Sequence, residues 1–181
     1  CGEPVVDDGP RTVCTNRFGC AAQLKGRVIH FGSRSALDIE GLGEETANLL
    51  VDQKLVTQLA ELFDFTAEQL ITFDGFGEKS AGALVGAIAA KKTPDLARFL
   101  VALGIPEVGV TVARTLAAHF GTFDAIRTAT AEELVAIGGI GPRMSEAITG
   151  FFADERSAAT VSAILDRGVR PQAVEVVASD L

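Results

Sequence analysis

A tight turn that contains glycine recurs four times in this chain, each time between two apolar stretches that suit helices. Measured from the first turn position (residues 41, 75, 107 and 139), the spacing is 34, 32 and 32 residues. A period of this length indicates one supersecondary unit used repeatedly. The unit is a helix, a glycine–apolar–glycine turn and a second helix. The four turns are Glu40-Gly41-Leu42-Gly43, Asp74-Gly75-Phe76-Gly77, Glu107-Val108-Gly109-Val110 and Gly138-Gly139-Ile140-Gly141.

The two glycines of each turn have different expected roles. The first permits a backbone conformation that side chains disfavour. The second lets a phosphate oxygen approach the unpaired N–H groups at the start of the next helix. The apolar residue between them is expected to point inward. One such turn is also an ordinary helix stop, but four in register favour a binder of phosphate backbones that has no sequence preference.

The residues around each turn show that the four turns are not equally suited to binding phosphate. Glu44 and Glu45 follow the first turn and repel phosphate, so we expect that turn to be mainly structural. In the third turn Glu107 replaces the first glycine, and we expect a differently built turn through Ile105-Pro106. Cations and hydroxyls follow the other turns, although charged residues at helix starts also fit an ordinary solvated surface. The candidate phosphate-binding residues are Gly75, Gly77, Lys79, Ser80, Gly109, Thr111, Arg114, Gly139, Gly141, Arg143 and Ser145.

Composition favours a mainly helical chain with a sizeable core. Hydrophobic residues make up 48% of the 181 positions, and Trp and Tyr are absent. No apolar run approaches the roughly 20 residues that a membrane span needs. The net charge of −8 argues against tight binding of nucleic acid by this chain alone. Helix ends and turn amides need few cations, however, and a larger parent protein could supply more.

Helix starts are marked in the sequence. Thr66 with Gln69, and Thr130 with Glu133, have the spacing of a capping box. Apolar residues at 96, 99, 100 and 103 predict a helix over 95–103. Residues 21–36 are expected to be a connector. The helices after the turns are expected over 44–52, 79–91, 111–119 and 143–152, with the repeats paired one-two and three-four around a shared core.

All the cysteines (Cys1, Cys14 and Cys20) lie in the first 20 residues, an arrangement that fits a disulfide framework poorly. A structural zinc site needs four ligands from two short loops. The fourth ligand is a cysteine that precedes Cys1, or His30; alternatively the three are unrelated free thiols. A short β-hairpin is expected within residues 2–13, with its turn at 7–10.

Several strings together resemble one family. The turns resemble helix-hairpin-helix motifs, and Cys14-Thr15-Asn16…Cys20-Ala21-Ala22-Gln23 resembles the zinc knuckle of bacterial NAD-dependent DNA ligases. Residues 30–43 and 99–109 are similar to that family's entries into the first and third hairpins. The resemblance covers residues 1–170, and its order of modules is specific.

The resemblance implies a fold and a set of domains. The fold is mainly α, with four helix-hairpin-helix motifs in two pseudo-symmetric pairs after a small four-cysteine zinc finger with a short β-hairpin. Residues 1–25 are the finger, truncated at its N-terminus; 26–170 are the tandem domain; and 171–181 are a linker toward a further domain. Zinc is held by Cys1, Cys14, Cys20 and a cysteine upstream of Cys1.

The resemblance also implies a function in DNA replication and repair. The parent is a cytoplasmic bacterial ligase that seals nicks through a lysyl-adenylate formed from NAD, with magnesium. Its Lys-x-Asp-Gly motif does not occur in this sequence, so we expect a non-catalytic segment that grips nicked double-stranded DNA beside other domains of the same ligase, without membrane contact. The alternatives are a free-standing helix-hairpin-helix DNA-structure binder and a protein-interaction module, which Glu44, Glu45 and the acidic surface favour.

Overall fold

Helices make up most of the regular structure, as the composition predicts. The computed structural model describes residues 1–16 and 19–174. No helix in this part of the chain is long and apolar enough to cross a membrane. The elements are β1 (Val5–Asp8), β2 (Arg11–Cys14), α1 (Ala21–Gly32), α2 (Glu44–Asp52), the 3₁₀ helix η1 (Leu59–Phe63), α3 (Ala67–Ile71), α4 (Glu78–Ala89), α5 (Leu96–Ala102), α6 (Val110–Phe120), α7 (Phe123–Thr128), α8 (Ala131–Val135), α9 (Pro142–Ala153) and α10 (Glu155–Asp166).

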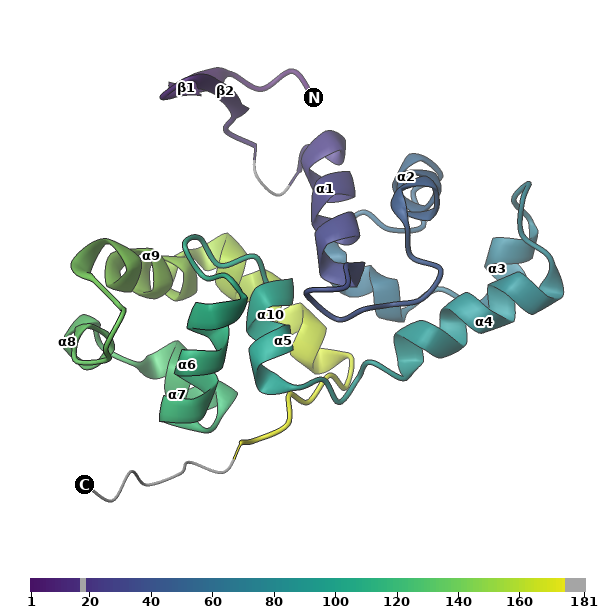
Figure 1. The fold of residues 1–181 in the computed structure, drawn as a ribbon. Helices are drawn as coiled ribbons and strands as arrows, with labels where there is room; N and C mark the ends of the chain where they lie inside the picture. The colour runs from purple at the N-terminus through teal and green to yellow at the C-terminus, as the bar shows by residue number, and fades with distance from the viewer. Residues whose placement is uncertain (17–18, 175–181) are drawn as a thin grey trace.

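The predicted β-hairpin is confirmed. Strands β1 and β2 pair antiparallel from Val5↔Cys14 to Asp8↔Arg11. The loop between them is shorter than expected, because Asp7 and Asp8 belong to β1 and only Gly9 and Pro10 form the turn. Gly9 has a φ of 61°, a conformation that glycine adopts easily. Figure 1 shows the hairpin standing apart from the helical body.

The helical body has two groups of helices (Figure 1). Helices α1 to α4 lie on one side, α5 to α9 on the other, and α10 lies between them. Helix α10 packs against both η1 and α9, while α1 packs against α5. One hydrophobic cluster runs through both groups, with Phe31 and Phe99 wholly buried in it. The expectation of a shared core is therefore confirmed.

All four turns have the same backbone geometry. Their first positions have positive φ values: 84° at Gly41, 94° at Gly75, 67° at Glu107 and 89° at Gly139. In each, the N–H of the next residue donates to the carbonyl three residues earlier, at 3.1–3.2 Å. The third turn is therefore built like the others, and the expectation of a different turn through Ile105-Pro106 is wrong. The turns lead into α2, α4, α6 and α9, which pack against α1, α3, α5 and α8 respectively.

The helix starts agree closely with the sequence. Both capping boxes are present: Gln69 Oε1 accepts from the Thr66 N–H at 2.9 Å, and Glu133 Oε2 accepts from the Thr130 N–H at 2.8 Å. Helix α2 has the predicted bounds. Helices α4, α6 and α9 begin one residue earlier than predicted, because the glycine that ends each turn is the N-cap.

Helices α1 and α10 are among the elements that the sequence analysis did not predict. The expected connector over 21–36 is largely helix α1, and the domain boundary predicted after residue 25 lies inside it. Leu24 and Val28 on this helix are buried in the common core. Helix α10 begins where Asp154 accepts from the Ser157 N–H at 2.8 Å. Its buried Val161 and Ile164 complete the centre of the body.

The predicted linker over 171–181 begins with residues that are held in place. The Gln172 N–H donates to the Pro94 carbonyl at 2.8 Å, and the Val174 N–H donates to the Gly121 carbonyl at 2.8 Å. Residues 171–174 are thus part of the helical body. Residues 175–181 lie outside the described part of the chain.

A matched pair of substitutions tests the turn geometry. We expect Gly75→Ser to lower the free energy of unfolding by about 1–2 kcal/mol, because a side chain disfavours positive φ. Gly77→Ser, two residues later, has an ordinary φ of −108° at an N-cap, where serine is preferred. It should leave stability unchanged or slightly raised. Equilibrium denaturant unfolding measures both, and equal losses would contradict the assigned roles.

Candidate nucleic-acid interface and metal centre

The glycine that ends each turn is the N-cap of the following helix. Gly43, Gly77, Gly109 and Gly141 have φ values of −87°, −108°, −90° and −88°, with ψ close to 180°. Any residue can adopt this extended backbone. A Cβ atom added at any of the four would meet no other heavy atom within 4 Å. The fold itself therefore does not require glycine at these positions.

These N-caps expose the starts of four helices of 9 to 12 residues. The first N–H groups of a helix have no partner within it, and they carry partial positive charge. In α4, the Ser80 hydroxyl accepts from the Gly77 N–H at 3.0 Å and donates to the Gly77 carbonyl at 3.2 Å. Ser80 therefore already has partners at its own helix start. In α9, Pro142 supplies no N–H.

The second residue of each helix after a turn is exposed and differs between the repeats. It is Glu45 after the first turn, Lys79 after the second, Thr111 after the third and Arg143 after the fourth. The structure thus places Lys79, Thr111 and Arg143 at equivalent sites, and Arg114 is exposed one helical turn beyond Thr111. The first repeat presents a carboxylate in this register.

Ser145 does not belong with these residues. Its side chain is buried, with 1% exposure, and its hydroxyl donates to the Ala131 carbonyl at 3.0 Å. The side chain therefore joins α9 to α8 and cannot contact a phosphate, which corrects the sequence prediction. The alignment of the repeats could have indicated that Ser145 is buried, because the equivalent residues in the other three repeats are small and buried: Ala47, Ala81 and Ala113.

The third and fourth turns share an ion pair, and the first and second turns share a cleft. Arg143 Nη2 lies 2.9 Å from Glu107 Oε1, so an ion pair joins the fourth turn to the third. The Arg143 side chain is 88% exposed, and salt screens such a pair readily. Gly41 of the first turn and Gly75 of the second line one cleft of about 510 Å³.

The cleft between the first two turns is acidic. Three carboxylates line it, from Glu40, Glu45 and Asp74, while its other lining residues are uncharged. A phosphate that entered this cleft would be repelled. The cationic residues of the turns therefore lie outside it.

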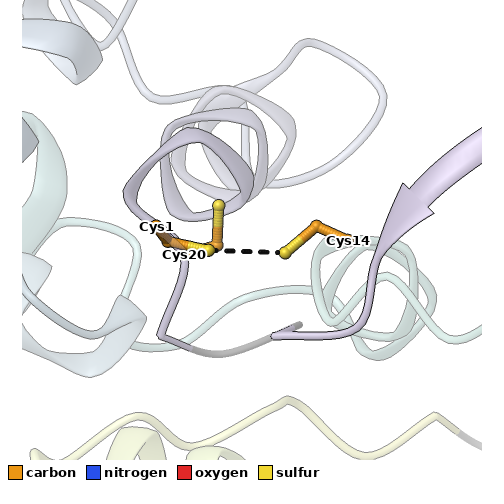
Figure 2. Close-up of side chains that lie close together, drawn as sticks. All are labelled: Cys1, Cys14 and Cys20. Atoms are coloured by element: carbon orange, nitrogen blue, oxygen red, sulfur yellow. Dashed lines mark hydrogen bonds between the residues drawn. The ribbon is translucent and has the colours of Figure 1, made fainter. Parts of the chain in front are cut away.

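The three cysteines converge, as Figure 2 shows. Cys14 ends β2, Cys20 is the N-cap of α1, and all three sulfurs lie within 4.8 Å of one another. The Cys1 and Cys14 sulfurs are 3.5 Å apart. Four sulfurs around a tetrahedral zinc ion are about 3.8 Å apart, given Zn–S bonds of about 2.3 Å. The group therefore fits three corners of a metal site.

The start of α1 favours the metal-binding form of Cys20. The backbone N–H of Gln23 lowers the pKa of the Cys20 thiol; burial acts in the opposite sense, and the Ala22 N–H and the Cys14 thiol add to the lowering. The net pKa lies below the ordinary value. A thiolate, and not a thiol, is the metal ligand.

His30 is placed elsewhere. Its Nε2 lies 2.6 Å from the Val101 carbonyl oxygen on α5, and among the described residues it is not part of the cysteine group. This geometry gives no support to the alternative in which His30 is the fourth ligand.

Two family models match the chain. One, a SAM-like helix-hairpin-helix tandem, matches residues 33–91, and a helix-hairpin-helix motif matches residues 98–161. The chain is 45% identical to a DNA ligase of Natronomonas pharaonis over 97% of its own length and 25% of the relative. It is 42% identical to a DNA ligase of Azotobacter vinelandii over 94% of its own length and 22% of the relative. The chain belongs to the DNA ligase family. It spans about a quarter of the length of these curated relatives.

Gln23 is a residue of this ligase segment that the sequence did not mark as functional. Its Nε2 donates to the Cys14 carbonyl at 3.0 Å and to the Asn16 carbonyl at 3.1 Å. One amide group thus holds the backbone of Cys14 and Asn16 against α1. The signal in the sequence is its place at the end of the string that resembles a zinc knuckle, three residues after Cys20 on the same helical face.

We expect Gln23→Leu to lower the affinity for zinc about tenfold, since groups that hold ligand loops typically contribute this much. Gln53→Leu, at the exposed end of α2, is the matched control and should leave the affinity unchanged. Competition with a chromogenic chelator measures both variants in the full chain. Equal affinities would show that Gln23 does not position the site.

Proposed function

We propose that this chain is the duplex-binding segment of an NAD-dependent DNA ligase, and that its turns hold backbone phosphates around a nick. The observation that carries the proposal is glycine at the N-caps of the second, third and fourth hairpins. Serine, aspartate and asparagine rank above glycine as N-caps, and the space and the φ values at Gly77, Gly109 and Gly141 would admit them. A side chain there would hold a phosphate oxygen away from the helix N–H groups.

The proposal includes two pseudo-symmetric pairs of hairpins. The shared cleft at Gly41 and Gly75 supports the first pair, and the ion pair between Glu107 and Arg143 supports the second. The matches to residues 33–91 and 98–161 divide the chain in the same way. The second pair would place two helix N-termini side by side, one for each strand of a duplex, while the first pair would offer only that of the second hairpin.

The hairpins contribute unequally. In the second, Gly75 positions the turn and Gly77 with Lys79 meets phosphate. In the third, Gly109, Thr111 and Arg114 take these roles, and in the fourth Gly139, Gly141 and Arg143. The first hairpin, with Glu44 and Glu45, is structural. Ser80 acts through its cap at Gly77, and the burial of Ser145 removes it from the set.

We also propose that the metal is zinc and that it is structural. Cys1, Cys14 and Cys20 would supply three thiolates, and a cysteine that precedes Cys1 in the polypeptide would supply the fourth. Four thiolates leave no open position for catalysis. Zinc would fix β1 and β2 against the start of α1. NAD and magnesium would act in other parts of the ligase, where a Lys-x-Asp-Gly lysine is adenylated.

The double variant Gly77→Ser/Gly141→Ser tests the carrying observation. We expect at least about tenfold weaker binding of a nicked duplex, equivalent to about 1.4 kcal/mol, with no loss of folding stability. Fluorescence anisotropy with a labelled nicked duplex measures the affinity. Gly150→Ser is the control, because it makes the same change on the exposed later part of α9, where nothing lies within 4 Å of the added Cβ. Unchanged affinity in the double variant would refute the proposed role of the glycines.

Lys79→Ala and Arg143→Ala test the cations. Each should weaken binding of the same duplex and reduce the slope of log K against log salt by about one, as the loss of one phosphate contact does. Arg156→Ala, which removes an exposed charge at the start of α10, should leave the slope unchanged. The two assigned contacts are wrong if all three variants share the slope of the unmodified chain.

A further inference from the structure

We propose that a pocket lined by Arg34, Arg98 and Arg114 binds a backbone phosphate of the duplex beyond the third turn. The inference rests on the proposed function and extends the interface to two residues outside the hairpin turns. The pocket has a volume of about 480 Å³. Its arginines come from the loop after α1, from α5 and from α6, so that tertiary packing alone brings them together.

The pocket concentrates positive charge in an acidic chain. Its three arginines face one lining carboxylate, that of Asp95. This carboxylate is engaged at the start of α5, where its Oδ1 accepts from the Arg98 N–H at 3.0 Å. The remaining lining residues are Ser35 and small or branched apolar residues, which leave room for a close approach: Ala97, Val101, Val110, Ala117, Ala118 and Val174.

One of the arginines is fixed and the other two are available. Arg98 Nη1 donates to the Arg34 carbonyl at 3.0 Å and to the Ala36 carbonyl at 2.8 Å. A guanidinium has five N–H donors, so this anchoring leaves the Nε and Nη2 donors for a ligand. Within residues 1–16 and 19–174, the guanidinium groups of Arg34 and Arg114 form no ion pair.

The chemistry of the pocket selects phosphate. Three guanidinium groups that face a single carboxylate repel one another, and an anion with several oxygens relieves that repulsion. The planar fork of arginine donates two parallel bonds to phosphate. Lys25, Arg127, Arg143 and Arg167, by contrast, each have a carboxylate partner within 3.0 Å.

The pocket continues the surface of the third hairpin. Val110 is the first residue of α6, directly after the N-cap Gly109, and it lines the pocket together with Arg114. Four residues of helix span about 6 Å. Each strand of a duplex carries one phosphate per about 3.4 Å of its axis. A strand held at the third turn would therefore bring a neighbouring phosphate to Arg114, Arg34 and Arg98.

Arg34→Gln is the decisive variant. The bond from Arg98 uses the backbone carbonyl of Arg34, so this substitution removes the charge and keeps the loop in place. We expect an unchanged melting temperature, a salt slope reduced by about one for nicked-duplex binding by the full chain, and affinity reduced about tenfold at low salt. Arg114→Gln should behave alike, and Arg156→Gln is the control that removes one charge elsewhere.

The outcomes separate this inference from the proposed function. If the unmodified chain binds the duplex and Gly77→Ser/Gly141→Ser weakens binding, while Arg34→Gln matches Arg156→Gln, the pocket is not a phosphate site and the turns still are. If the unmodified chain does not bind the duplex, the proposed function fails and the pocket assignment fails with it. A salt slope that is reduced in Arg34→Gln and unchanged in Arg156→Gln supports the pocket as a phosphate site.

Discussion

A single residue with positive φ determines the shape of each helix-hairpin-helix unit of this chain. At Gly41, Gly75, Glu107 and Gly139 the backbone reverses, and the following N–H closes the turn on a carbonyl three residues earlier. The next side chain is then turned inward, as the buried Leu42, Val108 and Ile140 show. The residue after the apolar one becomes an N-cap on the surface. Core packing and exposed helix starts thus arise from one backbone constraint.

Glu107 is the exception that shows how strong this constraint is. A side chain in the left-handed region costs about 1–2 kcal/mol relative to the right-handed one, yet the third turn keeps the common geometry. The ion pair with Arg143 is too exposed to offset the cost, since such pairs contribute about 0–1 kcal/mol. The main effect of Glu107 is on charge, because its carboxylate lies 2.9 Å from a cation of the neighbouring turn. A phosphate that approaches Arg143 must compete with it.

The predictable parts of the molecule are those that local chemistry decides. Thr66 and Thr130 form capping boxes with the residues three positions later, Gln69 and Glu133. The turn glycines adopt a positive φ that the local backbone requires. Helix α1 escaped prediction because Cys20 is a poor cap and Gly26 interrupts its pattern, so that only the packing of Val28 and Phe31 reveals it. Helix α10 follows α9 after the single residue Asp154, which hides the boundary. The arginine pocket could not be predicted at all, because residues 34, 98 and 114 have no common spacing.

The placement of charge reconciles a net charge of −8 with the proposed binding of a polyanion. At physiological salt, charges separated by more than about 8 Å are largely screened, so the groups near each phosphate matter more than the total. Glu40, Glu45 and Asp74 line the cleft between the first two turns, whereas Arg34, Arg98 and Arg114 line a pocket beside the third. A duplex on the proposed interface would therefore lie closest to the second, third and fourth turns. The first hairpin would then stabilise the hydrophobic core without contacting the duplex.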